Sequence, residues 1–157
     1  MNKNKSAVVI IIVIVILLII LFAWPRFSDS TRAQVKVWQE AGVECLPSHQ
    51  NASLHIHPAL QIIVDGTPEG ILANVGIVRS CMAEIHTHDA SGTIHVESIL
   101  AGKEFTLNQL FTVWDKTLER PGFTLEMTVD GLPSQELGNL MLRDRQQIIL
   151  NYESAAQ

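Results

Sequence analysis

The chain has 157 residues, of which 47% are hydrophobic, and its 11 Lys and Arg against 16 Asp and Glu give a formal net charge of −5. This length accommodates one ordinary domain. The excess of negative charge argues against nucleic acid as a partner, because phosphates are bound by basic surfaces, and it suits a domain that attracts cations.

The N-terminal segment is strongly apolar. Residues 7–24 consist mainly of Ile, Val and Leu, and as a helix they would extend roughly 27 Å, close to the thickness of the hydrocarbon core of a bilayer. Trp24 stands where an interfacial aromatic is common, and Pro25 is expected to end the helix. The sequence therefore predicts a transmembrane helix over 7–24, with the lipid bilayer as its partner. The run is longer than the apolar part of a secretory signal, which favours an uncleaved anchor behind a short cytoplasmic N-terminus, residues 1–6.

The two cysteines indicate whether the domain lies in an oxidising or a reducing compartment of the cell. A tether is predicted over residues 25–44 and a single domain over 45–157, so that Cys45 and Cys81 both fall in the domain. They lack the C-x-x-C spacing of thioredoxin-like and zinc-ribbon proteins. An even pair forms one disulfide in an oxidising compartment, whereas the alternative is two buried thiols in a cytosolic domain. We expect the disulfide, and with it a single-pass protein of the cell membrane whose domain lies outside the cytoplasm.

The domain begins with a β pattern. Apolar and polar residues alternate over 54–64, which predicts a strand. Pro58 cannot donate a backbone hydrogen bond, so this strand is expected to be an edge strand or to be bulged near its start. Asp65-Gly66 marks the turn that follows. Further along, residues 83–98 carry turn residues at their centre and predict a β-hairpin.

The C-terminal part combines one helix with two strands. Thr106 and Gln109 have the spacing of a capping box, and apolar residues follow at helical intervals, so that an amphipathic helix is expected over 106–118. Strands are predicted over 124–129 and 147–152. The predicted fold class is therefore α+β: one N-terminal transmembrane helix, then a small, mainly antiparallel β domain with one amphipathic helix.

Five of the six histidines lie in two short segments, residues 55–57 and 86–95. In the predicted hairpin, a turn centred on Ala90-Ser91 places His86 opposite His95, and alternate residues of a strand lie on the same face. One face therefore carries the polar residues Glu84, His86, His88, His95 and Glu97. The reverse face carries the core residues Ala83, Ile85, Thr87, Ile94 and Val96.

Imidazoles and carboxylates gathered on one face indicate a metal site. The expected metal ligands are His55, His57, His86, His88, His95 and Glu97. Glu97 either binds the metal itself or accepts a hydrogen bond from the ring of a ligating histidine. Such ligands favour Zn or Cu over Ca and Mg. The predicted function is a membrane-anchored, extracytoplasmic domain that handles, delivers or senses Zn or Cu, with a membrane or extracytoplasmic protein as a further partner.

Three alternatives stay open. A metal-dependent hydrolase or oxygenase would use the same ligands with an open coordination position, and Glu84 is then the candidate acid or base. The histidine face would otherwise be an interaction surface without metal, or a cluster that responds to pH. No residue is assigned a catalytic role, because the sequence contains none of the common catalytic or nucleotide-binding motifs.

Several segments resemble a group of small, uncharacterised, membrane-anchored prokaryotic proteins that lie outside the cytoplasm. The similar segments fall between Cys45 and Trp114, and the most specific is the His-Thr-His-Asp-x-Ser-Gly part of the hairpin, at residues 86–92. Others are His55-Ile56-His57-Pro58-Ala59-Leu60 and Val64-Asp65-Gly66. The resemblance implies an anchored extracytoplasmic domain, and it implies no activity.

Overall fold

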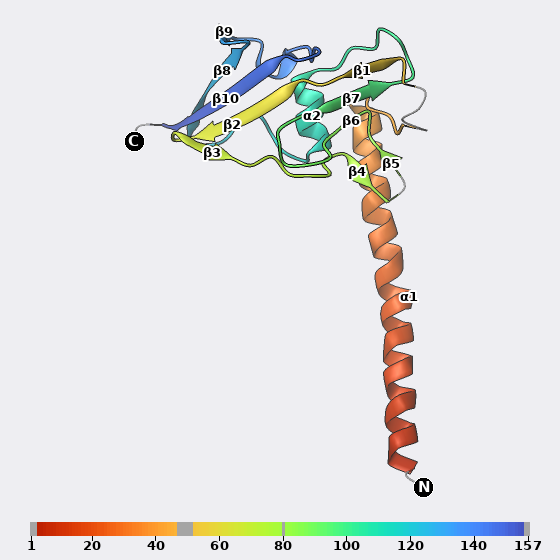
Figure 1. The fold of residues 1–157 in the computed structure, drawn as a ribbon. Coiled ribbons are helices and arrows are strands. Elements are labelled where there is room, and N and C mark those ends of the chain that lie inside the picture. Colours follow the sequence, from red (N-terminus) through yellow and green to blue (C-terminus); the bar gives the residue numbers. More distant parts are fainter. Residues whose placement is uncertain (1–2, 47–51, 80, 156–157) are drawn as a thin grey trace. The chain divides into compact units, whose positions relative to one another are not determined.

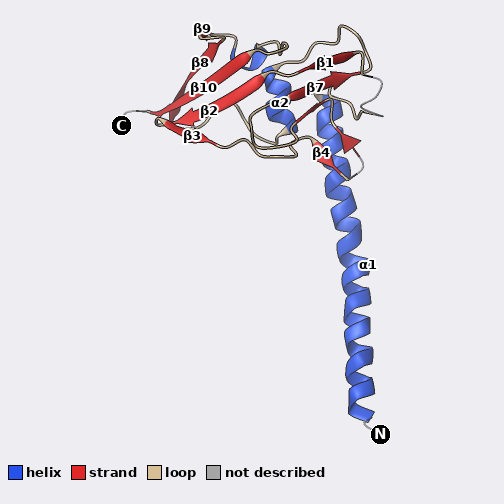
Figure 2. Ribbon diagram, in the orientation of Figure 1, coloured by secondary structure: helices blue, strands red, loops and turns tan. Residues whose placement is uncertain are grey.

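The computed structural model describes residues 3–46, 52–79 and 81–155 (Figure 1). The chain divides into two compact units, Met1–Lys36 and Val37–Gln157. Figure 2 shows that the first unit is helical and that the second combines strands with helices. The histidine at position 49 lies outside the described residues.

Helix α1 runs without interruption from Lys3 to Glu40, so Pro25 does not end it. Among the residues that the structure describes, none forms a helical stretch with the length and apolarity that crossing a membrane requires. This finding overturns the transmembrane helix over 7–24 and the localisation derived from it.

The second unit begins before the predicted domain start at Cys45. Trp38 and Val43 are buried, and the side-chain amide of Gln109 donates to the carbonyl of Ala41 at 2.8 Å. Residues 37–44 therefore belong to the compact unit, although the sequence was interpreted as a tether there.

A five-stranded mixed sheet forms one part of this unit, in the order β3-β2-β10-β8-β9. Its strands are β2 (Ala59–Val64), β3 (Thr67–Glu69), β8 (Phe123–Val129), β9 (Leu132–Ser134) and β10 (Gln147–Ser154). The central strand β10 pairs in parallel with β2 and antiparallel with β8. Tight turns at Asp65-Gly66 and Asp130-Gly131 join the outer pairs, and all four of these residues have positive φ, as two-residue hairpin turns require.

The second sheet has three strands, in the order β1-β7-β6. They are β1 (Leu54–Ile56), β6 (Ile85–His86) and β7 (His95–Ser98). A two-stranded sheet of β4 (Ile77–Val78) and β5 (Cys81–Met82) lies between β3 and β6 in the sequence.

The single strand predicted over 54–64 is divided between the two sheets at Pro58. This residue has no N–H to donate, but its carbonyl accepts from the N–H of Ile94 at 2.9 Å. The next residue, Ala59, donates to the carbonyl of Gln146, which begins the pairing with β10. The proline therefore ends β1, an edge strand, and allows β2 to start in another sheet.

Helix α2 (Leu107–Val113) begins at the predicted capping box, since Thr106 and Gln109 bond each other's backbone N–H groups. It ends at Trp114, earlier than expected, where Asp115 takes a positive φ of 57°. Four of its residues are buried: Leu107, Leu110, Phe111 and Val113. A short 3₁₀ turn, η2 (Leu137–Asn139), follows β9.

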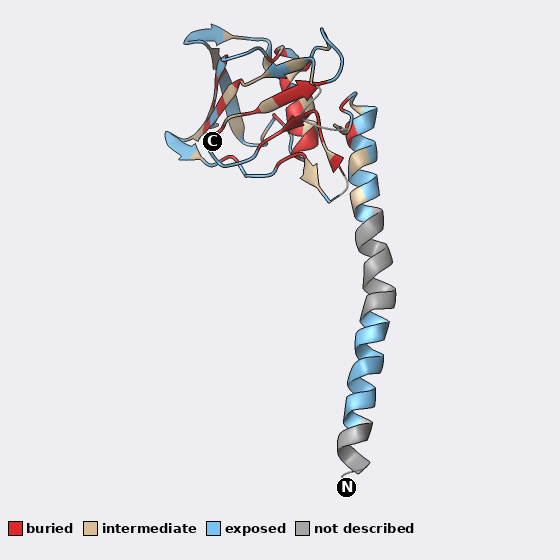
Figure 3. Ribbon diagram, turned by 45° about the vertical axis from the view of Figure 1, so that its right-hand side comes forward, coloured by how far each residue is buried: buried red, intermediate tan, exposed pale blue. Residues whose placement is uncertain are grey.

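The reverse face of the hairpin forms part of the core. The five residues assigned to it are all 0% exposed: Ala83, Ile85, Thr87, Ile94 and Val96. Figure 3 shows this buried region around α2 and β7. The domain is thus a mixed α+β arrangement with several antiparallel pairings, and the predicted fold class is wrong in the membrane helix that it included.

Candidate metal centre

Strand register places the histidines side by side. His86 on β6 is the partner of His95 on β7, as predicted. On the other side of β7, His55 on β1 is the partner of Glu97. Because β7 lies between β1 and β6, its side chains can contact those of both neighbours.

The five described histidines form two sets of ligand atoms. One set is His55, His57 and His95, and the other is His86, His88 and His95. Within each set the ligand atoms lie within 4.8 Å of one another. The ring centroid of His95 is 4.7 Å from that of His57 and 4.5 Å from that of His88. The fold therefore gathers all five predicted histidines around His95, in two groups that could hold a metal ion.

His86 has the most constrained ring of the cluster. It is 0% exposed, and its Nδ1 lies 2.9 Å from the carbonyl oxygen of Ala83. Since a carbonyl only accepts, Nδ1 carries the proton and Nε2 offers a lone pair. That Nε2 lies 3.2 Å from Nε2 of His88. Two nitrogens bound to one tetrahedral zinc ion at 2.0–2.1 Å are about 3.3–3.4 Å apart, so the observed spacing suits a shared ion.

Burial keeps the imidazoles of His86 and His95 neutral near pH 7. Burial lowers the pKa of the His86 imidazole to about 4, although the hydrogen bond to Ala83 and the charge of Glu97 oppose the shift. Burial also lowers the pKa of His95, with the charges of His88 and His57 adding to the effect. A neutral imidazole is the form that binds metal, so no proton has to be removed from these two rings at neutral pH.

The low pKa of His86 predicts an acid-sensitive domain in the absence of metal. Between the unfolded value of 6.5 and the folded value of about 4, the unfolded chain binds more protons, so stability falls as pH falls through this window. The contribution of His86 amounts to at most about 3 kcal/mol. Urea unfolding of the metal-free wild type and of His86→Gln at pH 7.5 and 4.5 measures it. An equal loss in both proteins would assign the acid sensitivity to other groups.

Glu97 lies beside the cluster and belongs to neither set of ligand atoms. It is 2% exposed, and its Oε1 is 3.3 Å from Nε2 of His55. A carboxylate that bonds the ring of a metal-ligating histidine orients that ring and raises its basicity. Of the two roles expected for Glu97, the geometry matches the acceptor role.

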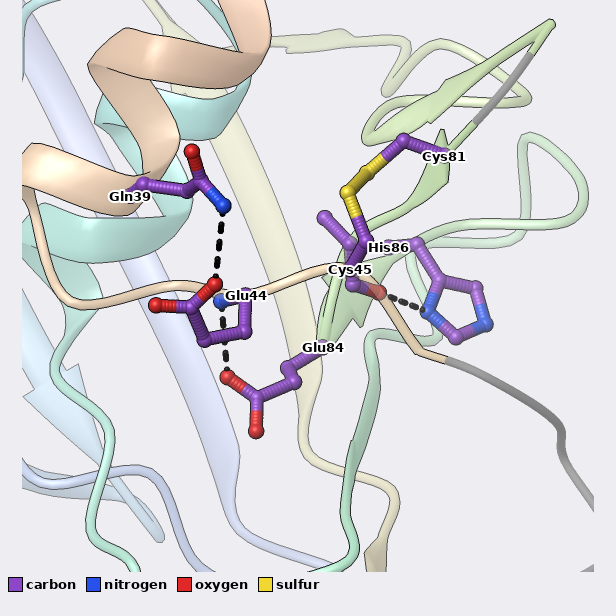
Figure 4. Close-up of a disulfide and its surroundings, with 7 residues drawn as sticks. Gln39, Glu44, Cys45, Cys81, Glu84 and His86 are labelled. Atoms are coloured by element: carbon purple, nitrogen blue, oxygen red, sulfur yellow. Dashed lines mark hydrogen bonds between the residues drawn. A yellow bond between two sulfur atoms is a disulfide. The ribbon is translucent and has the colours of Figure 1, made fainter.

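Glu84 lies in a different environment from the one that strand alternation predicted. Its carboxylate accepts from the Glu44 N–H at 2.9 Å (Figure 4). It also accepts from the Ser98 hydroxyl at 2.7 Å and pairs with Lys103. Ser98 follows Glu97 on β7, so its side chain lies on the opposite face. The alternation fails because Glu84 is at a bend before β6 begins. Glu84 is therefore not positioned to act as an acid or base at the histidine site.

The buried contacts of Glu84 predict a structural role. Glu84→Gln removes the charge that pairs with Lys103 and is expected to destabilise the domain by about 1–3 kcal/mol, with metal affinity unchanged. Chemical denaturation and a metal titration of the same variant check both expectations. A large loss of metal affinity with unchanged stability would show instead that this carboxylate acts on the site.

A disulfide joins Cys45 and Cys81, as predicted, with Cα atoms 5.2 Å apart. Beside it, Leu46 donates to the carbonyl of Met82, and Cys45 forms a bridge with Ala83. The covalent link therefore fixes the backbone segment whose Ala83 carbonyl orients His86 (Figure 4).

Gly76 is a supporting residue that sequence reasoning missed. Its φ is +75°, and a Cβ atom there would lie 2.4 Å from the carbonyl oxygen of Ile85 and 3.1 Å from Cβ of His86. The sequence shows only an isolated glycine after Asn74, which does not distinguish a turn from close backbone packing. The backbone thus approaches His86 at a position that only glycine fits.

Gly76→Ala is expected to destabilise the domain by at least about 2 kcal/mol, since the new methyl group is strained by the positive φ and meets the Ile85 carbonyl. It should also weaken metal binding by moving His86. Gly131→Ala is the matched control, because it has a similar φ of +81° and nothing within 4 Å of the added Cβ. Thermal melting and metal titration compare the two variants, and equal effects of both would argue against a special role for Gly76.

Comparisons with protein-family models, with curated proteins and with solved structures find no match to this chain. The resemblance to membrane-anchored prokaryotic proteins therefore stays a prediction. Function is inferred from the arrangement of the side chains alone.

Proposed function

We propose that the chain binds one Zn(II) or Cu(II) ion through His86, His88 and His95 and serves to hold, deliver or sense that ion. The observation that carries the proposal is the environment of His86. Its ring is fully buried, its tautomer is fixed by the Ala83 carbonyl, and its Nε2 lies 3.2 Å from Nε2 of His88. Packing thus holds two ligand nitrogens at the separation that a metal ion needs.

The chemistry of the donors supports zinc or copper. Imidazole nitrogens bind these ions well, whereas calcium and magnesium prefer oxygen ligands. Both cysteines are in the disulfide, so no thiolate is left to select Cu(I). The disulfide is also typical of proteins from an oxidising environment.

Metal handling fits the geometry better than catalysis does. Three histidines leave one tetrahedral position for water or for a ligand of a partner, an arrangement that enzymes share with metal carriers. An enzyme would also need an acid or base beside the ion. Glu84, the candidate from the sequence, is held by Lys103 and Ser98 instead. Oε1 of Glu97 lies 3.3 Å from Nε2 of His55, which suits a role in orienting that ring.

A titration of the metal-free full chain tests the proposal. Zn(II) and Cu(II) are each added in competition with a chelator of known affinity, and the melting temperature is followed. At an ion concentration 100 times the Kd, binding should add about 2.7 kcal/mol to the free energy of unfolding. Ca(II) and Mg(II) serve as controls and should add nothing. Identical responses to all four ions would contradict the proposal.

A further inference from the structure

His95 belongs to both sets of ligand atoms. Its ring stands between two pairs of histidines, with the centroid of His57 at 4.7 Å and that of His88 at 4.5 Å. The structure thus offers a metal ion two positions that have one ligand in common. We call the set His86, His88 and His95 the inner set, and the set His55, His57 and His95 the outer set.

The two sets differ in burial. The inner set contains His86, which is 0% exposed, and the hydrogen bond to Ala83 fixes its ring. The outer set has no fully buried member, and the side chain of His55 is 50% exposed. The inner set also includes the exposed His88, so its ligands are the more rigid only at His86, whereas an ion in the outer set has no buried ligand.

Charge favours one ion at a time. Two divalent ions that share a ligand ring would bring four positive charges close together in a partly buried site, where repulsion is poorly screened. Among the described residues, the charge of Glu97 acts on His86 and His95 and that of Asp89 interacts with His88 and His95, which offsets only part of four positive charges. The inner and outer positions are therefore expected to exclude each other.

The carboxylate of Glu97 interacts with histidines of both the inner and the outer set. Its carboxylate contacts His55 of the outer set, and its charge also acts on His86 and on the shared His95. The same negative charge thus remains near the ion wherever it is bound.

We infer that a single ion moves between the two sets by ligand exchange, with His95 bound throughout, and that the outer set takes up and releases it. This inference rests on the proposed function. In the exchange, the nitrogens of His55 and His57 leave the ion as those of His86 and His88 bind, and no electron is transferred. Two ligands are replaced while one is kept, so the ion is not released to water between the positions.

Three alanine variants of the full chain, with Zn(II) as the probe, test the inference. His57→Ala removes only the outer set, His88→Ala only the inner set, and His95→Ala affects both. Equilibrium dialysis measures the number of ions bound per chain, and stopped-flow transfer to a chromophoric chelator measures the rate of release. Gln61→Ala, at an exposed position of β2, is the control, and circular dichroism confirms that each variant is folded.

The wild type is expected to bind one ion per chain. His57→Ala should keep that ion within about 3-fold of the wild-type affinity but release it at least about 10-fold more slowly. His88→Ala should bind one ion at least about 10-fold more weakly, and His95→Ala at least about 100-fold more weakly.

Two ions per wild-type chain would overturn the inference. So would an unchanged release rate in His57→Ala, because the ion would then leave directly past His88, whose side chain is exposed. In both cases the proposed function would stand. A wild type that binds no ion at all would instead remove the proposed function itself.

Discussion

Replacing His86 by alanine is expected to lower the affinity for Zn(II) or Cu(II) by at least about 10-fold, which corresponds to about 1.4 kcal/mol. The variant removes the ligand whose orientation is fixed by burial and by the Ala83 carbonyl. The remaining members of the inner set, His88 and His95, cannot complete three-nitrogen coordination. Competition with a chelator of known affinity measures the change.

Loss of folding must be separated from loss of a ligand in this experiment. His86→Ala also leaves a cavity in a buried site, which destabilises the domain by itself. His88→Ala is the companion variant, because His88 is exposed and its removal leaves no buried void. Both variants should lose affinity, whereas only His86→Ala should lose much stability without metal. Wild-type affinity in both would refute the assignment of the inner set.

Removal of the disulfide is expected to have the largest effect on stability. Cys45 and Cys81 are 36 residues apart, and a link that closes a loop of this size is worth about 4 kcal/mol in the chain-entropy description. The double variant Cys45→Ser/Cys81→Ser should therefore unfold at a much lower urea concentration than the wild type. Metal affinity should fall as well, because the link fixes the segment that carries Ala83.

A reducing agent provides the control for this prediction. Wild-type protein unfolded in the presence of reductant should match the double serine variant, and the variant itself should be insensitive to reductant. A stability difference below about 1 kcal/mol between oxidised and reduced wild type would contradict the expected contribution.

The local parts of the fold could be predicted from the sequence where a short motif determines them. Period-two alternation placed His86 opposite His95 and the apolar hairpin residues in the core. The spacing of Thr106 and Gln109 located the start of α2. In each case neighbouring residues along the chain make the interactions, so their pattern contains the information.

Other features depend on contacts between distant segments and were missed. Glu84 lies at the bend before β6, and its carboxylate contacts Lys103 and the backbone N–H of Glu44. The strand predicted across Pro58 divides because Ala59 pairs with a segment far along the chain. Alternation and hydropathy do not encode such long-range pairings.

The candidate site shows the same division. Its histidines could be found by counting and by strand parity, whereas the full burial of His86 and the Ala83 carbonyl that fixes its tautomer required the structure. The position of His95 between two ligand sets also arises from β1 pairing with β7, which the sequence did not predict.

X-ray diffraction from crystals of the full chain grown with zinc, recorded on both sides of the zinc absorption edge, tests the central claim most directly. We predict one anomalous peak per chain, about 2.0–2.1 Å from Nε2 of His86 and of His88. A zinc-loaded crystal with no anomalous peak among His55, His57, His86, His88 and His95 would contradict it.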